Sequence, residues 1–466
     1  MRYSLVLLIF VAYAALCFYC WRRHQRQQVQ AVFKPAAQDD ASATMQMQPW
    51  LVAFASQTGQ AQSIAERSAQ QLSDAGLNVH CLALNQLKPI NLKNYAQALF
   101  VVSTYGEGEA PDNGARFIDQ LAGVDLNRLN YAVLALGDSS YPYFCAFGHK
   151  LAHALQHAGA KAAFDLIEVD ALHEAKDAAD QAGSLRHWQY YLGQLSGHSD
   201  FADWQKPVYE QWQLIERQEL NTGSSGAPVF HLRLKPREGE CVVSQWCAGD
   251  IVEIGPYNNP QLPHREYSIA STPSQGSLDL LVRQVRKNNG ELGLGSGWLT
   301  HHTTLNSPLN LRIRRNPSFH PPTHDVPLIL IGNGTGIAGL RAHLLARIEM
   351  GRHQNWLFFG ERNAACDLHF GEQLQHWRDN GQLARMDVVF SREAGVGINY
   401  QPCYVQDLLE GATEELNKWL SQGAAIYVCG SLQGMAQGVD QALTKMLGRE
   451  GLENLAEEGR YCRDVY

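Results

Sequence analysis

Short apolar runs recur through residues 49–195, and each is followed by glycine and hydroxyl residues. The runs occupy residues 50–55, 98–102 and 131–136, and residues 63–75 show helical spacing of their apolar positions. Continuous apolar runs indicate strands buried on both faces, as in a parallel sheet covered by helices. The pattern therefore predicts a doubly wound α/β domain over residues 49–195.

The pattern changes over residues 207–321, where short β-like runs are separated by turn residues. The runs are 212–219, 229–234, 251–254, 267–270, 278–285 and 309–313. Six short strands with turns between them predict an all-β domain, which we expect to be an antiparallel barrel.

A second doubly wound pattern covers residues 325–466. The apolar run 327–331 leads into the glycine-rich segment 332–339, and a helical pattern follows through Leu345. Further apolar runs occur at 356–359, 386–390 and 425–429. A glycine-rich loop between a strand and a helix suits the pyrophosphate of a dinucleotide, so we expect a nicotinamide dinucleotide here.

The N-terminal segment carries a different signal. Residues 4–21 have no formal charge, and Arg22, Arg23 and Arg26 follow them. This length is near the lower limit for a bilayer-spanning helix, and the charges after the run place the rest of the chain in the cytoplasm. We therefore expect a single-pass transmembrane anchor over residues 1–23, in the inner membrane if the protein is bacterial.

Two segments lack a sustained apolar period. Residues 24–48 predict a flexible tether after the anchor, and residues 196–206 predict a linker that lets the two flanking domains swing. The predicted organisation is thus an anchor, a tether, a first α/β domain, a linker, a barrel and a second α/β domain.

Composition limits the function. A chain of 466 residues with 45% hydrophobic and 18% charged residues can form about three globular domains. The formal net charge of −8 argues against a nucleic-acid-binding protein, which would carry a basic stripe. The ten cysteines form no CxxC pair and no zinc-ligand spacing, so the sequence signals no metal site.

The strand-end loops of residues 49–195 carry the first candidate chemistry. Ligands of open α/β sheets bind outside the carboxyl ends of the strands, so the loops after the three apolar runs should converge. The loop 56–62 offers hydroxyl groups, a glycine and a following helix N-terminus to a phosphate. Tyr105 and Tyr141 in the next two loops are placed to enclose a planar ring.

The other two regions add two further nucleotide sites. Arg265, Tyr267 and Ser268 offer a cation for a pyrophosphate, an aromatic face and a hydroxyl group, and the glycine-rich segment 293–299 suits a pyrophosphate. Ser391 and Arg392 follow the run 386–390 and offer the groups that bind a 2′-phosphate, with no acidic residue beside them. This favours NADPH over NADH.

The segments 56–62, 103–109 with Asp112-Asn113, and 136–145 resemble the FMN domains of diflavin reductases, the family of sulfite reductase flavoproteins and NADPH-hemoprotein reductases. The resemblance implies a flavodoxin-like FMN domain in which Ser56 to Ala61 bind the phosphate, Tyr105 and Tyr141 flank the isoalloxazine, and Asp170 is a weaker contact. The implied FMN residues are Ser56, Gln57, Thr58, Gly59, Gln60, Ala61, Ser103, Thr104, Tyr105, Gly106, Leu136, Gly137, Asp138, Ser139, Ser140, Tyr141, Phe144, Cys145 and Asp170.

The later motifs resemble the FAD and NADP modules of the ferredoxin-NADP reductase superfamily. The implied FAD residues are Arg265, Glu266, Tyr267, Ser268, Leu281, Val282, Arg283, Gly293, Leu294, Gly295, Ser296 and Tyr466, and the implied NADPH residues are Thr335, Ser391, Arg392, Tyr404 and Gln406. Three positions depart from the family pattern: Gly339 replaces a Pro, Pro402 a Lys and Gly438 an Asp. About 58 residues separate Pro207 from Arg265, so the large connecting domain of the microsomal type is missing or vestigial.

The same resemblance implies a site for hydride transfer. Ser268, Cys429 and Asp464 would surround the nicotinamide, with Ser268 and Asp464 orienting the ring and stabilising its cation. The terminal Tyr466 would stack on the isoalloxazine and leave before the nicotinamide can approach.

The sequence therefore predicts an NADPH-dependent diflavin reductase, in which electrons pass from NADPH to FAD, to FMN and to a one-electron acceptor. Residues 49–195 contain 14 acidic and 9 basic residues, with Glu107, Glu109 and Asp112 beside the FMN edge, so we expect a basic heme or iron protein to dock there. Two alternatives stay open. One is a membrane-anchored ferric-chelate reductase without a protein partner, and the other is a non-catalytic flavin-binding sensor.

Overall fold

The computed structural model describes residues 48–95, 97–139, 141–170, 178–197, 208–237, 245–259, 262, 264–287, 289–392 and 403–466. The predicted anchor (1–23), nearly all of the predicted tether (24–48) and most of the predicted linker (196–206) lie outside these residues. The described chain forms three sheets, which we call the first, middle and third sheets.

The first sheet is parallel and has the order β2-β1-β3-β4-β5, with β6 also paired to β4. Its strands are β1 (Trp50–Ala55), β2 (Val79–Ala83), β3 (Gln97–Ser103), β4 (Asn130–Gly137), β5 (Lys161–Ala162) and β6 (Ile167–Asp170). Helices α3 (Gln60–Asp74) and α6 (Ala178–Ser196) cover one face, and α4 (Phe117–Gln120) and α5 (Ala146–His157) cover the other. This strand order is that of doubly wound flavodoxin-like sheets, as predicted.

The middle sheet is antiparallel, with the order β10-β9-β12-β7-β8-β11. Its strands are β7 (Glu210–Glu219), β8 (Val229–Pro236), β9 (Ile251–Ile254), β10 (Arg265–Ser268), β11 (Leu278–Arg283) and β12 (Pro308–Arg314). All six predicted runs are therefore strands. An isolated bridge between Ile269 and Leu280 joins the two ends of the sheet. The closed FAD-binding barrel stays a prediction.

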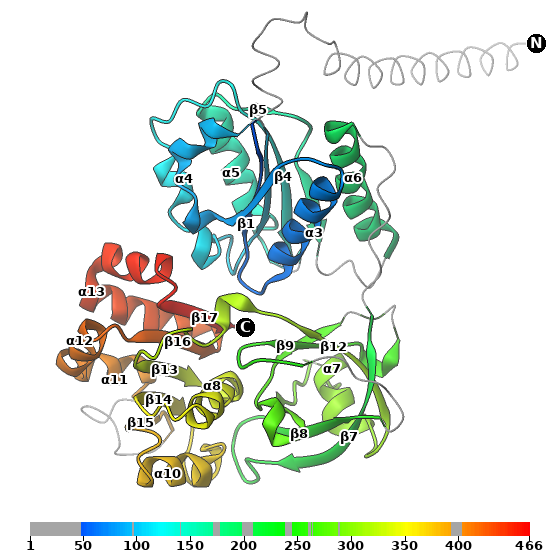
Figure 1. Cartoon of the computed structure of the whole chain (residues 1–466). Coiled ribbons are helices and arrows are strands. Elements are labelled where there is room, and N and C mark those ends of the chain that lie inside the picture. Colours follow the sequence, from blue (N-terminus) through cyan, green and yellow to red (C-terminus); the bar gives the residue numbers. More distant parts are fainter. Residues whose placement is uncertain are drawn as a thin grey trace, which may run out of the picture.

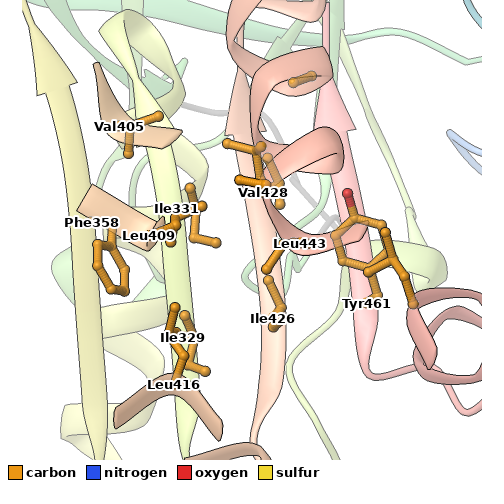
Figure 2. Close-up of a cluster of buried hydrophobic side chains, with 14 of the residues drawn as sticks. Ile329, Ile331, Phe358, Val405, Leu409, Leu416, Ile426, Val428, Leu443 and Tyr461 are labelled. Atoms are coloured by element: carbon orange, nitrogen blue, oxygen red, sulfur yellow. The ribbon is translucent and has the colours of Figure 1, made fainter. Parts of the chain in front are cut away.

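The third sheet is parallel and has the order β15-β14-β13-β16-β17. Its strands are β13 (Leu328–Asn333), β14 (Asn355–Glu361), β15 (Arg385–Phe390), β16 (Ala425–Gly430) and β17 (Tyr461–Val465). Helices α8 (Ile337–Glu349) and α10 (Gly371–Asp379) cover one face, and α11 (Val405–Gly411), α12 (Thr413–Ser421) and α13 (Gln437–Glu457) cover the other. Figure 2 shows the second face, where side chains from the sheet meet those of the helices. Strand β17 was not predicted; it forms because residues 461–465 pair with β16.

The three sheets meet around the C-terminus, which lies between the first sheet and the other two (Figure 1). The middle and third sheets share one hydrophobic core, in which Ala270 and Leu281 of the middle sheet lie with Leu328, Ala338 and Cys429 of the third. The last strand, β17, is thus positioned to contribute side chains toward both neighbours.

The predicted membrane localisation is wrong. Among the residues that the structure describes, no helix is both long enough and apolar enough to cross a bilayer. The long helix α13, for example, carries six charged residues (Asp440, Lys445, Arg449, Glu450, Glu453 and Glu457), which a bilayer-spanning helix would have to bury in hydrocarbon. The segment 4–21 on which the anchor was predicted lies outside the described residues.

Candidate functional site

Loops at the carboxyl ends of β1, β3 and β4 line a cavity of about 350 Å³, which we call the loop cavity. The residues predicted for FMN that line it are Gln57, Thr58, Gln60, Ser103, Thr104, Tyr105, Gly106, Leu136, Gly137, Asp138, Tyr141 and Cys145. The cavity is closed from the other side by groups that sequence analysis missed, namely Glu253, His264 and Arg314 of the middle sheet. These three carry no local motif, and only the packing of the sheets brings them to the loops.

The loop between β1 and α3 has the features of a phosphate site. Gly59 has a φ of +78° and precedes the first turn of α3, so the loop turns where a side chain would be strained. The Ser56 hydroxyl is buried and has no hydrogen-bond partner among the described residues. An orphaned buried donor at a helix N-terminus fits an anionic ligand.

The side chain of Gln57 has a second role that the sequence did not indicate. Its amide nitrogen donates to Asp112 Oδ2 (2.9 Å) and to the carbonyl of Arg463 (2.8 Å), while its amide oxygen accepts from the Asp112 backbone N–H (3.0 Å). Gln57 therefore links the first sheet to β17 of the third.

The two predicted ring-flanking tyrosines differ in their surroundings. Tyr105 is 8% exposed and packs against the hydrophobic cluster of the third sheet, whereas Tyr141 is 41% exposed. Burial raises the pKa of Tyr105 well above its usual value, so its phenol stays neutral. Its hydroxyl has no hydrogen-bond partner among the described residues.

The β4 loop is held by close backbone contacts. A Cβ on Gly137 would lie 2.7 Å from the backbone nitrogen of Cys145, so only glycine permits this packing. The Asp170 carboxylate accepts a hydrogen bond from the Ser139 N–H (3.1 Å). Asp170 therefore holds the loop in place. Burial raises the pKa of Cys145 to about 12. Ser140 lies outside the described residues.

A second cavity, of about 810 Å³, lies between the middle and third sheets, and we call it the central cavity. The predicted FAD residues that line it are Arg265, Glu266, Tyr267, Ser268, Leu281, Val282, Arg283, Gly293, Leu294, Gly295, Ser296 and Tyr466. A Cβ on Gly295 would lie 2.6 Å from Arg265 Cγ and 2.9 Å from the Tyr267 hydroxyl, so the glycine lets the two motifs touch. Arg283, whose buried Nε lacks a partner among the described residues, offers a cation that suits a pyrophosphate.

The three residues predicted to surround the nicotinamide come together. The Ser268 hydroxyl donates to Asp464 Oδ2 (2.6 Å), and the Cys429 thiol lies 3.8 Å from the same oxygen. They meet because Ser268 ends β10, while Cys429 and Asp464 are register partners on β16 and β17. Burial raises the pKa of Asp464 and, with the nearby Asp464 carboxylate, raises that of Cys429. The thiol therefore stays protonated.

Tyr466 extends β17 over this site. Its N–H donates to the Gly430 carbonyl (3.0 Å), and its phenol donates to the Thr335 hydroxyl (3.2 Å). The residue is 56% exposed and lines both the central and the loop cavity. Because more than half of the residue is exposed, its ring can move without disturbing the buried core.

A third cavity, of about 470 Å³, lies at the carboxyl ends of β13, β14 and β15, and we call it the outer cavity. Ser391, Tyr404 and Gln406 line it, whereas Arg392 is exposed and Thr335 lines the central cavity instead. Glu361 and Arg362 also line it and were missed. Only Gly360 separates them from the apolar run 356–359, so the rule that ligands bind at strand ends could have found them.

The departures from the family pattern have local consequences. A Cβ on Gly438 would lie 2.9 Å from Gln406 Cδ, so the glycine lets Gln406 approach α13. A Cβ on Gly339 would lie 3.1 Å from the Cys429 sulfur, so the absence of a side chain at this position leaves room beside the thiol. Pro402 lies outside the described residues.

Polar groups connect the first sheet to the third. Arg463 binds Asp112 through two guanidinium nitrogens, Nε at 3.0 Å and Nη2, and its guanidinium also lies 5.5 Å from the centre of the Tyr105 ring. Burial opposes the charge of Arg463, but the Asp112 carboxylate more than offsets this and raises its pKa. Arg116 binds Glu453 (2.8 Å) and Asn454 (2.7 Å) of α13.

Two parts of the chain match known protein families. The flavodoxin family model matches residues 52–188, and the model of the oxidoreductase NAD-binding domain matches residues 330–441. Relatives named sulfite reductase (NADPH) flavoprotein alpha-component occur in Bacillus subtilis, with 26% identity covering 89% of each chain, and in Mannheimia succiniciproducens, with 27% identity and the same coverage. A protein of the same name from Vibrio vulnificus is 27% identical over 96% of this chain and 92% of its own.

The alignments are longer than this chain. The Bacillus subtilis alignment spans 544 positions against 466 residues here, so the relative contains segments that this chain lacks. This agrees with the short distance between Pro207 and Arg265 in the sequence.

Proposed function

Because this chain belongs to the diflavin reductase family, we propose that its three cavities form the electron path of an NADPH-dependent flavoprotein oxidoreductase. The enzyme uses NADPH, FAD and FMN and passes electrons in that order to a one-electron acceptor. We propose that the loop cavity holds FMN, the central cavity FAD and the outer cavity the adenosine half of NADPH. The corresponding domains are proposed at residues 49–195, 207–321 and 325–466.

One observation carries this assignment: Tyr466 lines both the loop cavity and the central cavity. The two proposed flavin sites therefore adjoin, and they also share Thr58, Arg265, Glu266 and Val465 as lining residues. Arg283 and Gly334 line both the central and the outer cavity, so the proposed FAD and NADPH sites adjoin as well. A continuous series of sites is what sequential electron transfer requires.

When bound, the cofactors supply the hydride and single-electron chemistry, and the chain positions them. The Ser268 hydroxyl and the Asp464 carboxylate, hydrogen-bonded to each other, would orient the nicotinamide and stabilise its positive charge. Cys429, kept as a thiol, would pack against the ring without acting as a nucleophile. Tyr466 would cover the flavin and leave when the donor enters.

For the acceptor we propose a heme protein, because the relatives are named as components of sulfite reductase. We further propose that it docks on the acidic edge of the first sheet, where Glu107 and Glu109 are exposed. A basic partner would be attracted to this edge, and the rate of its reduction should fall as salt is added. An acceptor that also used Asp112 would have to displace Arg463.

The test is to release and quantify the flavins of the full chain and then mix it with NADPH or NADH without oxygen. We expect one FMN and one FAD per chain, both bleached much faster by NADPH. A chain that bound a single flavin, or flavins that NADPH left oxidised, would overturn the proposal. Activity with ferric chelates equal to that with any heme protein would instead favour the ferric-chelate reductase.

A further inference from the structure

Glu361 is an acidic residue in a cavity that the proposed function assigns to a polyanionic ligand. It is the last residue of β14, its side chain is 6% exposed, and it lines the outer cavity with Gly334 and Ser391. A Cβ on Gly334 would lie 3.5 Å from Glu361 Oε1, so the carboxylate lies beside the glycine-rich loop. The backbone carbonyl of Glu361 accepts from the Ser391 N–H (2.8 Å), which ties the two strand ends together.

The two carboxylate oxygens of Glu361 differ. Oε2 accepts a hydrogen bond from the backbone N–H of Arg362 (3.1 Å), whereas Oε1 is buried and accepts none from any described residue. Arg283 Nη2 and His369 Nε2 each lie 3.6 Å from Oε1, too far for a good hydrogen bond, and the Arg283 guanidinium is close enough to offset the charge of the carboxylate. A buried acceptor without a donor is unfavourable unless a ligand supplies the donor.

The chemistry of the ligand limits which donor this is. Phosphate oxygens accept hydrogen bonds and are repelled by a carboxylate, so the partner must be a hydroxyl or amino group. In NADPH the adenosine ribose joins the pyrophosphate to the 2′-phosphate. Glu361 lies between the glycine-rich loop, proposed to bind the pyrophosphate, and Ser391, proposed to bind the 2′-phosphate. The free donor on that ribose is its 3′-hydroxyl.

We propose that Glu361 accepts a hydrogen bond from the 3′-hydroxyl of the adenosine ribose of NADPH. The inference rests on the proposed donor site and adds to it a residue that recognises the sugar. In other dinucleotide-binding sheets an acidic side chain hydrogen-bonds the ribose 2′-hydroxyl of NAD, and Glu361 would make the same kind of hydrogen bond to the neighbouring 3′-hydroxyl. Arg283 would offset its charge, so that the nearby phosphates still bind.

The test compares two ligands by calorimetric titration of the oxidised full chain. One is adenosine 2′,5′-bisphosphate, and the other is the same molecule without its 3′-hydroxyl. A hydrogen bond to a charged acceptor predicts that the unaltered chain binds the deoxy ligand about tenfold more weakly. In Glu361→Ala the two ligands should bind equally, and in Glu361→Gln, which keeps an acceptor without the charge, the difference should be about threefold.

The matched control is Glu414→Ala, an exposed acidic residue of α12, which should keep the tenfold difference. Equal binding of both ligands by the unaltered chain would overturn the role of Glu361 while leaving the donor site in place, and this result does not depend on any variant folding. A tenfold difference that persisted in Glu361→Ala and Glu361→Gln would assign the hydroxyl to another group. No binding of adenosine 2′,5′-bisphosphate would overturn the proposed donor site and this inference with it.

Discussion

The third sheet contacts its two neighbours in opposite ways. Against the middle sheet the contact is a continuous hydrophobic core, in which Phe319 is fully buried and its ring lies 5.0 Å from that of His343 and 5.3 Å from that of Tyr427. Against the first sheet the contact consists mainly of ion pairs and hydrogen bonds made by Asp112 and Arg116. Tyr105 is the aromatic exception, packed on the third sheet and lying beside Arg463.

This difference determines which sheets can move relative to each other. The stabilisation from buried apolar area is unaffected by moderate salt, whereas partly exposed ion pairs are weak and are screened by salt. The middle and third sheets should therefore behave as one body, to which the first sheet is attached by contacts that can be broken and remade. Strand β17 belongs to both contacts, because Arg463 binds Asp112 of the first α/β region and Asp464 accepts a hydrogen bond from Ser268 of the middle sheet.

The largest expected effect comes from removing Phe319. We expect Phe319→Ala to lower the free energy of unfolding of the middle and third sheets by about 3–5 kcal/mol, because it leaves a cavity in their shared core. Urea unfolding followed by circular dichroism measures this. Phe319→Leu, which fills more of the space, should cost less, and a loss below about 1 kcal/mol for the alanine variant would contradict a shared core.

A smaller effect is expected at the Asp112–Arg463 pair. Arg463→Gln leaves Asp112 partly buried without its ion partner, which should weaken the docking of the first sheet by about 2 kcal/mol. Hydrogen exchange of the β17 amides should then become faster, while exchange in β13 stays unchanged. Glu109→Gln, an exposed change on the same loop, is the control. Equal exchange in Arg463→Gln and the unaltered chain would show that the pair does not hold the sheets together.

Changing pH should act on the other side of β17. Burial raises the pKa of Asp464 above its ordinary value of 3.8, so the folded chain holds this proton at a higher pH than the unfolded chain does. The resulting stability is fully present below pH 3.8 and is lost as pH rises through the raised pKa. The unfolding midpoint of the unaltered chain, compared with that of Asp464→Asn at each pH, should fall as pH rises through this range. In Asp464→Asn this part of the pH dependence should vanish; its persistence would assign the dependence to another group.

The smallest effect is expected at Arg116. Its pairs with Glu453 and Glu457 lie at the surface, so Arg116→Ala should weaken docking by only about 0.5 kcal/mol at low salt. The same exchange experiment should show no difference between this variant and the unaltered chain in about 0.5 M salt, where the ions are screened. A difference that survived high salt would mean that Arg116 contributes through its hydrogen bond to Asn454 or through packing instead.

Much of the fold could be predicted from local pattern. The three apolar runs of the first sheet, the six runs of the middle sheet and the runs of the third sheet all became strands, because buried strands need apolar side chains whatever their neighbours are. The glycines at positions 59 and 295 were identified through motifs. In the structure Gly59 adopts a left-handed backbone conformation, and Gly295 lets Arg265 and Tyr267 approach closely. Strand β17 was missed because its residues pair only with β16, which is distant in sequence.

The sequence by itself determined the order of the candidate ligand loops and the residues that they contain, since each loop lies directly after the strand that presents it. Tertiary structure alone decided which loops meet. Asp464 reaches Ser268 across 196 positions, Gln57 reaches Arg463 across 406, and Glu361 comes to lie beside Gly334. The physical reason is that such contacts depend on the packing of whole sheets, which the pattern of one segment does not specify.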